Sequence, residues 1–326
     1  MMNNKVLAAV KRYDMLKEND RVLIGLSGGA DSCSLLYVML GLKDSYSLDI
    51  RACHINHKLR GSESDSDELF VRRLCDRLCV PLDVFSLDIA AAAKKHESTE
   101  ETARKLRYER FSELCGKYGA KLATAHTASD NAETVLMNII RGTGTKGLAG
   151  IPPIRDDIIR PLIFCTREDI LSYCAEKGIE YVTDSTNLKD DYTRNRIRHN
   201  LIPELERFNP SFLGAVTRMT VSVREDNAFL DEYAVNERKK CERAGKLDSR
   251  ALDSLALPVK SRIIASVLKE NGIEPSTLRI EQCLDIIKKG AGKVNICMNR
   301  FALVRKKLFF IDIQEQHYRH KQGFSG

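Results

Sequence analysis

The chain has 326 residues, of which 43% are hydrophobic and 30% charged, and its formal charge at pH 7 is +7. This composition is typical of a globular protein with a large core and excludes a disordered chain. At this length two domains are the default expectation. Because no apolar run approaches the roughly 20 residues of a membrane helix, we expect no membrane function. The positive charge permits an anionic partner such as nucleic acid.

The ten cysteines are irregularly spaced and include no Cys-x-x-Cys pair. This spacing does not match a small secreted disulfide framework, and the first residues lack the apolar core of a signal peptide. We therefore expect reduced thiols and a cytoplasmic protein. Small core residues are a better interpretation of these cysteines than metal ligands.

Over the first 210 residues, short apolar runs alternate with longer segments that have helical spacing. The apolar runs are rich in Val, Ile and Leu, as buried parallel strands are, and cover 21–27, 49–56, 81–88 and 121–126. The segments with helical spacing cover 32–42, 64–79, 99–118 and 129–140. This alternation predicts an α/β domain of the nucleotide-binding type over 1–210, with an open, mainly parallel sheet and helices on both faces.

The alternation ends near residue 210. Two segments of mixed charge and helical spacing, 212–241 and 247–289, predict a small, mainly helical second domain over 211–313. Within it, 301–313 is expected to form a strand that pairs with 293–298 as a hairpin. Residues 314–326 show no periodicity and are expected to be a loose tail.

The junction of the first strand and first helix carries Ser-Gly-Gly-Ala-Asp-Ser, residues 27–32. Ligands of open parallel sheets bind at the carboxyl ends of strands. Gly28 and Gly29 let backbone N–H groups approach an anion, and the following helix N-terminus adds positive charge. The loop matches neither the dinucleotide fingerprint nor the Walker spacing. The alternative is an ordinary turn with Asp31 or Ser32 as helix cap.

The complete loop resembles the PP-loop of ATP pyrophosphatases, which transfer AMP to an oxygen and release pyrophosphate. Further motifs follow in order and together resemble the tRNA(Ile)-lysidine synthetase family. They are HINHKLRGSESDSDELFV from His54, ESTEETARKLRYERF from Glu97, AHTASDNAETVLMNIIRGTGTKGLAGI from Ala125, RPL at Arg160, VTDSTN at Val182 and YTRNRIRHNLIPEL at Tyr192. The resemblance runs from about residue 20 to 203 and, less distinctly, to about 313.

The resemblance implies an ATP- and Mg²⁺-dependent ligase that joins free lysine to C2 of cytidine 34 in the CAU anticodon of tRNA(Ile). The reaction would pass through an adenylated base and change codon recognition from AUG to AUA. ATP would lie on Ser27, Gly28, Gly29, Ala30, Asp31 and Ser32, and the helical domain would hold the tRNA. Longer family members carry an additional C-terminal domain that is absent here, which indicates either a short form or a truncation. A homodimer is left open.

Two pairs of charged residues have spacings that place them on one helix face. Asp130 and Glu133 could hold Mg²⁺ through oxygen ligands, or could be an acidic pair stabilised by the helix dipole. The resemblance places both, with His126 and Asp31, at the reaction centre. Arg104 and Arg107 could bind phosphate or form surface ion pairs, and the resemblance favours a nucleotide contact, with Arg104 among the catalytic residues.

The remaining candidates are basic. Arg194, Arg196 and Arg198 suit the phosphates of tRNA or ATP, or a solvated surface. His54 and His57 lack further residues that would complete a metal site, which favours packing or hydrogen bonding near the sugar or adenine. Two basic runs, 238–246 and 305–307, are either a tRNA-binding surface or solvated faces.

Two rival functions share part of this pattern. A tRNA 2-thiocytidine synthetase would use the same fold and adenylation, but that group resembles Ser-Gly-Gly-Lys-Asp-Ser with Cys-x-x-Cys pairs, whereas this chain has Ala30 and no such pair. A tRNA-binding relative that has lost catalysis is the other alternative. The acidic residues beside the loop argue against it. In two further positions, Ser129 and Asn131, the chain departs from the usual family residues, and we expect neither to touch substrate.

Overall fold

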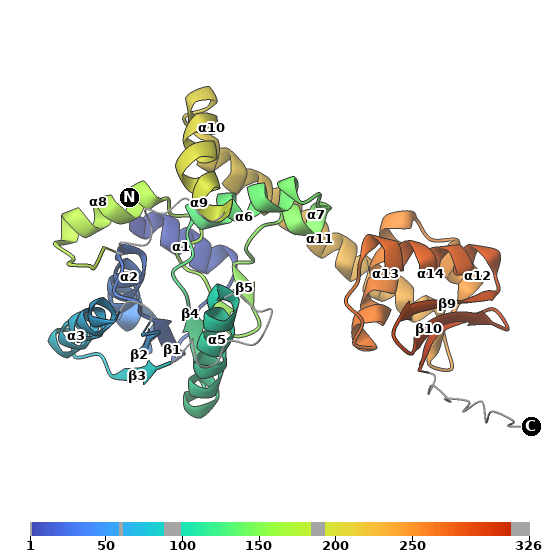
Figure 1. Cartoon of the computed structure of the whole chain (residues 1–326), viewed down its shortest axis with the longest axis horizontal. Coiled ribbons are helices and arrows are strands. Elements are labelled where there is room, and N and C mark those ends of the chain that lie inside the picture. The colour runs from blue at the N-terminus through green and yellow to red at the C-terminus, as the bar shows by residue number, and fades with distance from the viewer. Residues whose placement is uncertain (1, 59–60, 88–98, 184–192, 314–326) are drawn as a thin grey trace, which may run out of the picture. The chain divides into compact units, whose positions relative to one another are not determined.

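A computed structural model of the chain (Figure 1) describes residues 2–58, 61–87, 99–183 and 193–313. The chain divides into two compact units, Met1–Val223 and Arg224–Gly326, with the division inside helix α11 (Phe212–Cys241). The boundary expected near residue 210 lies just before this helix. The expected tail, 314–326, lies outside the described residues.

The N-terminal unit is built on a six-stranded sheet with strand order β3-β2-β1-β4-β6-β5. Its strands are β1 (Arg21–Gly25), β2 (Asp49–Asn56), β3 (Leu82–Ser86), β4 (Lys121–Ala123), β5 (Ile154–Arg155) and β6 (Ile158–Ile159). Neighbouring strands are parallel except β5 and β6. The strand order reverses between β1 and β4, which creates a switch point at their carboxyl ends. The predicted open, mainly parallel sheet is confirmed.

Both faces of this sheet are buried. Val22 and Ile24 belong to one core cluster, with residues of α1, α2, α3 and α8, while Leu23 between them packs with Phe111 of α5. Gly25 allows α5 to approach, because a Cβ there would lie 3.0 Å from Cζ of Phe111. The helices of the unit, besides α11, are α1 (Met2–Arg12), α2 (Ala30–Tyr46), α3 (Ser62–Arg77), α5 (Thr99–Tyr118), α6 (Ala128–Ile140), α7 (Thr145–Leu148), α8 (Arg167–Lys177), α9 (Thr193–Arg196), the π-helical turn η2 (Ile197–Leu201) and α10 (Ile202–Phe208).

The C-terminal unit combines the end of α11 with a five-stranded antiparallel sheet of order β7-β8-β11-β10-β9. Leu247, Val304 and Phe309 of the sheet share one core cluster with the helices. The strands are β7 (Glu242–Arg243), β8 (Lys246–Asp248), β9 (Gly292–Cys297), β10 (Arg300–Arg305) and β11 (Leu308–Ile313), and the helices are α12 (Ser249–Asp253), α13 (Leu257–Glu270) and α14 (Thr277–Lys289).

The segment 247–289 forms helices as predicted, but it begins in β8 and divides into three helices, of which Asp248 caps α12 and Ser276 caps α14. One prediction for this unit is wrong in detail. The expected strand 301–313 folds back at Lys306 and Lys307, whose φ angles of 51° and 62° form a two-residue hairpin turn. The expected pairing with 293–298 is present, as β9 with β10.

No helix within the described ranges is long and apolar enough to cross a bilayer. All ten cysteines are free, and most are buried. Burial raises the pKa of the Cys33 and Cys165 thiols to about 12, so these groups stay protonated. The interpretation of the cysteines as core residues is confirmed for the buried ones.

Candidate active site

The PP-loop connects β1 to α2 at the switch point of the sheet. Gly28 has φ +93°, which side chains rarely adopt. Ser32 Oγ accepts hydrogen bonds from the backbone N–H groups of Ser27 and Gly28, both at 3.2 Å, and donates to the Gly29 carbonyl at 3.0 Å. Gly29 is the N-cap of α2 and makes no side-chain cap hydrogen bond. The first turn of α2 is thus open to an anion in the loop.

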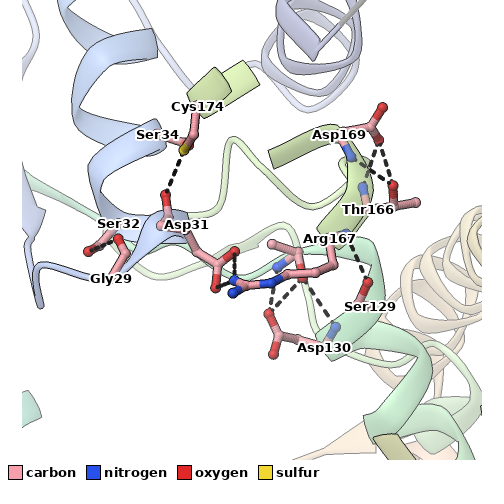
Figure 2. A network of polar contacts seen from close by, with 12 residues as sticks. Gly29, Asp31, Ser32, Ser34, Ser129, Asp130, Thr166, Arg167, Asp169 and Cys174 are labelled. Carbon is pink, nitrogen blue, oxygen red and sulfur yellow. Dashed lines mark hydrogen bonds and ion pairs between the residues drawn. The ribbon is translucent and has the colours of Figure 1, made fainter. Parts of the chain in front are cut away.

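Asp31 is held by an arginine from a distant helix, as Figure 2 shows. Nη1 of Arg167, the first residue of α8, lies 3.0 Å from both carboxylate oxygens of Asp31. The backbone N–H of Arg167 donates to Ser129 Oγ at 3.2 Å, which ties the start of α8 to the start of α6. Burial raises the pKa of Asp31, the Arg167 charge opposes this shift without cancelling it, and the Asp130 charge adds to it.

Asp130 and Glu133, in the first turns of α6, form a cluster with two arginines of α9 and η2. The Glu133 side chain is 1% exposed, and its Oε1 and Oε2 accept from Arg198 Nε at 2.5 Å and Arg194 Nε at 2.7 Å. Asp130 Oδ1 lies 3.3 Å from Nη2 of each arginine. Burial acts to lower the pKa of Arg198, but Glu133 and Asp130 outweigh burial and raise it.

The hydrogen-bond partners of Asp130 and Glu133 show whether their carboxylate oxygens are available to a magnesium ion. Oδ2 of Asp130 accepts from Thr127 N at 2.9 Å and Thr127 Oγ1 at 2.8 Å, in the capping box that starts α6. Oε2 of Glu133 accepts a further bond from Arg198 Nη2 at 3.0 Å. All four carboxylate oxygens face donors, and within the described ranges no cluster of three or more acidic, histidine or cysteine side chains could hold a metal. The arrangement does not fit the magnesium site expected at Asp130 and Glu133.

His126 follows β4 and lies beside this cluster. Its Nδ1 is 3.0 Å from Thr124 Oγ1. Burial lowers the pKa of His126 to about 4, the Asp130 charge opposes this only in part, and Arg160 adds to the lowering. The imidazole is therefore neutral at pH 7. The structure thus places His126 near Asp130, which shares Arg194 and Arg198 with Glu133.

A cavity of about 540 Å³ opens in front of the PP-loop. Its wall is formed by Ser27, Gly29, Asp31 and Ser32 of the loop, His54 and His57 at the end of β2, Arg104, Arg107 and Tyr108 of α5, and His126 with Asp130. The Arg104 guanidinium carbon lies 5.5 Å from the centre of the Tyr108 ring. Both α5 arginines are therefore placed beside the loop, where their charges can act on a phosphate chain.

A second cavity, of about 980 Å³, adjoins the first, because Asp31 and Asp130 line both. Its wall carries both signs of charge: carboxylates of Glu133, Glu168, Glu176 and Glu206, and guanidinium groups of Arg167, Arg198 and Arg218. Such a wall can bind a ligand that bears both an ammonium and a carboxylate group. Arg196, by contrast, is exposed and lines neither cavity.

Arg167 was not among the residues predicted from the sequence, because its only local signal is the capping box that Thr166 forms with Asp169 at the start of α8 (Figure 2). Asn131 is buried, with Nδ2 donating to Thr220 Oγ1 and Oδ1 accepting from Ile151 N. Ser129 Oγ accepts a hydrogen bond from the backbone N–H of Arg167, the residue whose side chain holds Asp31. The motif residues 59–60, 97–98, 184–187 and 192 lie outside the described residues.

This chain is similar to a family model, to curated proteins and to a solved structure. A family model described as a PP-loop domain matches residues 2–205. Curated tRNA(Ile)-lysidine synthases from Clostridium acetobutylicum and Persephonella marina are 39% identical over 271 residues and 34% identical over 334 residues. These matches cover 81% and 99% of this chain, and 59% and 73% of the relatives.

Among solved structures, the U34-tRNA thiolase NcsA from Methanococcus maripaludis with its 4Fe–4S cluster is 19% identical, with a TM-score of 0.58. The likeness covers 69% of this chain and 78% of that one and extends to the fold alone. The chain spans between about half and three-fifths of the length of several curated relatives that it matches. With the PP-loop geometry and identities of 34–46% to curated synthases, the chain belongs to the tRNA(Ile)-lysidine synthase family of PP-loop proteins.

Proposed function

We propose that this protein uses ATP to join the ε-amine of lysine to C2 of cytidine 34 in the CAU anticodon of tRNA(Ile). The observation that carries the proposal is the wall that two cavities share at Asp31 and Asp130. A base activated in the cavity in front of the PP-loop is then within reach of an amine held in the second cavity. Family membership supports the identity of the substrates, and a reaction on tRNA supports a cytoplasmic location.

In the first step, the C2 oxygen of the cytidine attacks the α-phosphorus of ATP. An oxygen–phosphorus bond forms to AMP, and the bond to pyrophosphate breaks. Negative charge grows on the leaving pyrophosphate, so the open N-terminus of α2 and the charges of Arg104 and Arg107 favour this step. Because Asp130 and Glu133 are held by arginines, we assign neither step to a metal bound there.

In the second step, the unprotonated lysine amine attacks C2. A carbon–nitrogen bond forms, the bond from C2 to the AMP oxygen breaks, and the amine loses a proton. Asp31 is suited to take this proton, because its raised pKa makes it a stronger base than an ordinary aspartate, while Asp130 positions the amine. The carboxylates and guanidinium groups of the second cavity match the ammonium and carboxylate groups of free lysine.

The C-terminal unit offers a basic surface for the tRNA. Of the two basic runs in the sequence, the first is partly neutralised, because Arg238 pairs with Glu270. Lys246 lies 3.7 Å from the centre of the Phe310 ring. Lys306 and Lys307 are exposed at the turn between β10 and β11. We propose that these lysines contact phosphates of the tRNA body, with affinity that falls as salt rises.

The test of the reaction is ATP-dependent incorporation of labelled lysine into a transcript of the CAU-anticodon isoleucine tRNA. The methionine tRNA, which carries the same anticodon, is the control. We expect label in the isoleucine tRNA alone, with one pyrophosphate released for each lysine joined. No incorporation, or equal labelling of both tRNAs, would refute this assignment.

A further inference from the structure

His54, near the end of β2, makes one hydrogen bond and leaves one ring nitrogen unused. The residue is 4% exposed, and its Nδ1 lies 2.9 Å from the backbone oxygen of Leu26. Because a carbonyl oxygen can only accept, Nδ1 carries the hydrogen. Burial lowers the pKa of His54, so the ring is neutral at pH 7. Nε2 therefore has no hydrogen and can act only as an acceptor.

This acceptor has no partner among the residues that the structure describes. Nε2 of His54 is buried and finds no donor within the part of the chain that the structure describes, although His54 lines the cavity in front of the PP-loop. Nδ1 of His57, in the same wall, is likewise buried and unpaired. Buried polar atoms of native proteins almost always have partners, so an unpaired acceptor in a cavity wall indicates that a ligand supplies the donor.

We propose that His54 Nε2 accepts a hydrogen bond from the nucleoside part of ATP. This inference rests on the proposed function, which makes ATP the ligand of the cavity. The phosphates and ring nitrogens of ATP only accept, so the available donors are the 6-amino group of adenine and the 2′- and 3′-hydroxyls of ribose. His54 is then a residue that helps select the nucleoside.

The position of His54 favours a ribose hydroxyl among these donors. The carbonyl that holds the ring belongs to Leu26, which immediately precedes the PP-loop residue Ser27. In ATP the ribose is joined directly to the phosphate chain, whereas the 6-amino group lies at the far edge of the base. A phosphate chain in the loop therefore brings ribose closer to His54 than it brings the amino group.

Two substitutions of His54 test the roles of its two ring nitrogens separately. The amide nitrogen of Asn can take the place of Nδ1, so His54→Asn keeps the bond to Leu26 and removes the unpaired acceptor Nε2. The longer Gln places its amide oxygen near the position of Nε2, so His54→Gln keeps an acceptor there and gives up the bond to Leu26. The two variants lose different contacts, and each is the control for the other.

The experiment measures the Kd of ATP, 2′-deoxy-ATP, 3′-deoxy-ATP and purine riboside 5′-triphosphate, which lacks the amino group, for the wild type and both variants by calorimetry. We expect the wild type to bind one analogue about three- to tenfold more weakly than ATP, as the loss of one neutral hydrogen bond requires. The analogue that loses affinity identifies the donor. His54→Asn should bind ATP and that analogue equally, whereas His54→Gln should still prefer ATP.

The outcomes separate this inference from the proposed function. If the wild type binds ATP and His54→Asn discriminates against the analogue as strongly as the wild type, His54 does not contact the nucleoside. Equal binding of all four nucleotides by the wild type would also overturn the inference, while the ATP site itself would stand. If the wild type binds no nucleotide, both the inference and the proposed function fail.

Discussion

Glu133→Gln removes one negative charge from the cluster of α6 while keeping the shape of the side chain. Glu133 accepts three bonds from Arg194 and Arg198, and Gln can satisfy one or two of them with its single oxygen. A bond to a charged group contributes about 1.5–3 kcal/mol, but the arginine side chains are 34% and 37% exposed, so water compensates part of the loss. We expect the free energy of unfolding to fall by about 2–3 kcal/mol.

Thermal unfolding of the whole chain, followed by circular dichroism, measures this effect. For a unit of this size the expected loss lowers the midpoint by about 4–12 °C. The matched control is Glu204→Gln on α10, because Glu204 pairs with Arg207 at 2.8 Å but is 52% exposed. That change should cost less than about 0.5 kcal/mol. Equal midpoints for the two variants would show that the Glu133 contacts do not stabilise the unit.

Three further changes test other parts of the site. Asp31→Ala changes a residue of the PP-loop that lines the proposed ATP cavity, in addition to removing the proposed base of the second step, so it should abolish ATP-dependent pyrophosphate release. Release near the wild-type rate would mean that the ATP site is misplaced. Gly28→Ala should destabilise the chain by about 1–2 kcal/mol in urea unfolding, because φ is +93° and the new Cβ would lie 3.3 Å from a valine methyl. Gly41→Ala, in the middle of α2 with open space around it, should instead stabilise by about 0.5–1 kcal/mol. His57 and His126 have pKa values lowered to about 4, so between pH 6.5 and 4 the unfolded chain takes up protons that the folded chain does not. Stability should therefore fall as pH falls through this window, and the double variant His57→Gln/His126→Gln should show a smaller fall in urea titrations at each pH.

Local periodicity made several elements predictable from the sequence. The strand 49–56 and the helix 99–118 have the bounds in the structure that their apolar spacing predicted. The strands β5 and β6 were missed, because two residues each are too few to show a period. The C-terminal sheet was only half predicted, since Lys306 and Lys307 are not residues that usually mark a turn with positive φ.

The sequence indicated candidate residues for the site, but it did not indicate which side chains pair with one another. The family resemblance grouped the PP-loop with Arg104, Arg107 and Asp130, and all of these line the cavity in front of the loop. Spacing on a helix does not show which counter-ion a carboxylate meets. The partners of Asp130 and Glu133 come from residues 61 to 68 positions later, and the partner of Asp31 from 136 positions later. Only the fold brings such groups together.

The pairing of Glu133 with later arginines has a consequence for how the chain folds as it leaves the ribosome. The strands β1 to β4 and helix α6 are all made before Arg194 is added. Until then, docking α6 would bury the Glu133 carboxylate without a counter-ion, at a cost of several kcal/mol. We therefore expect nascent chains that end before Arg194 to hold a formed sheet with α6 undocked. Emergence of Arg194 and Arg198 would supply the counter-ions of Glu133, so the order of synthesis sets when α6 can dock.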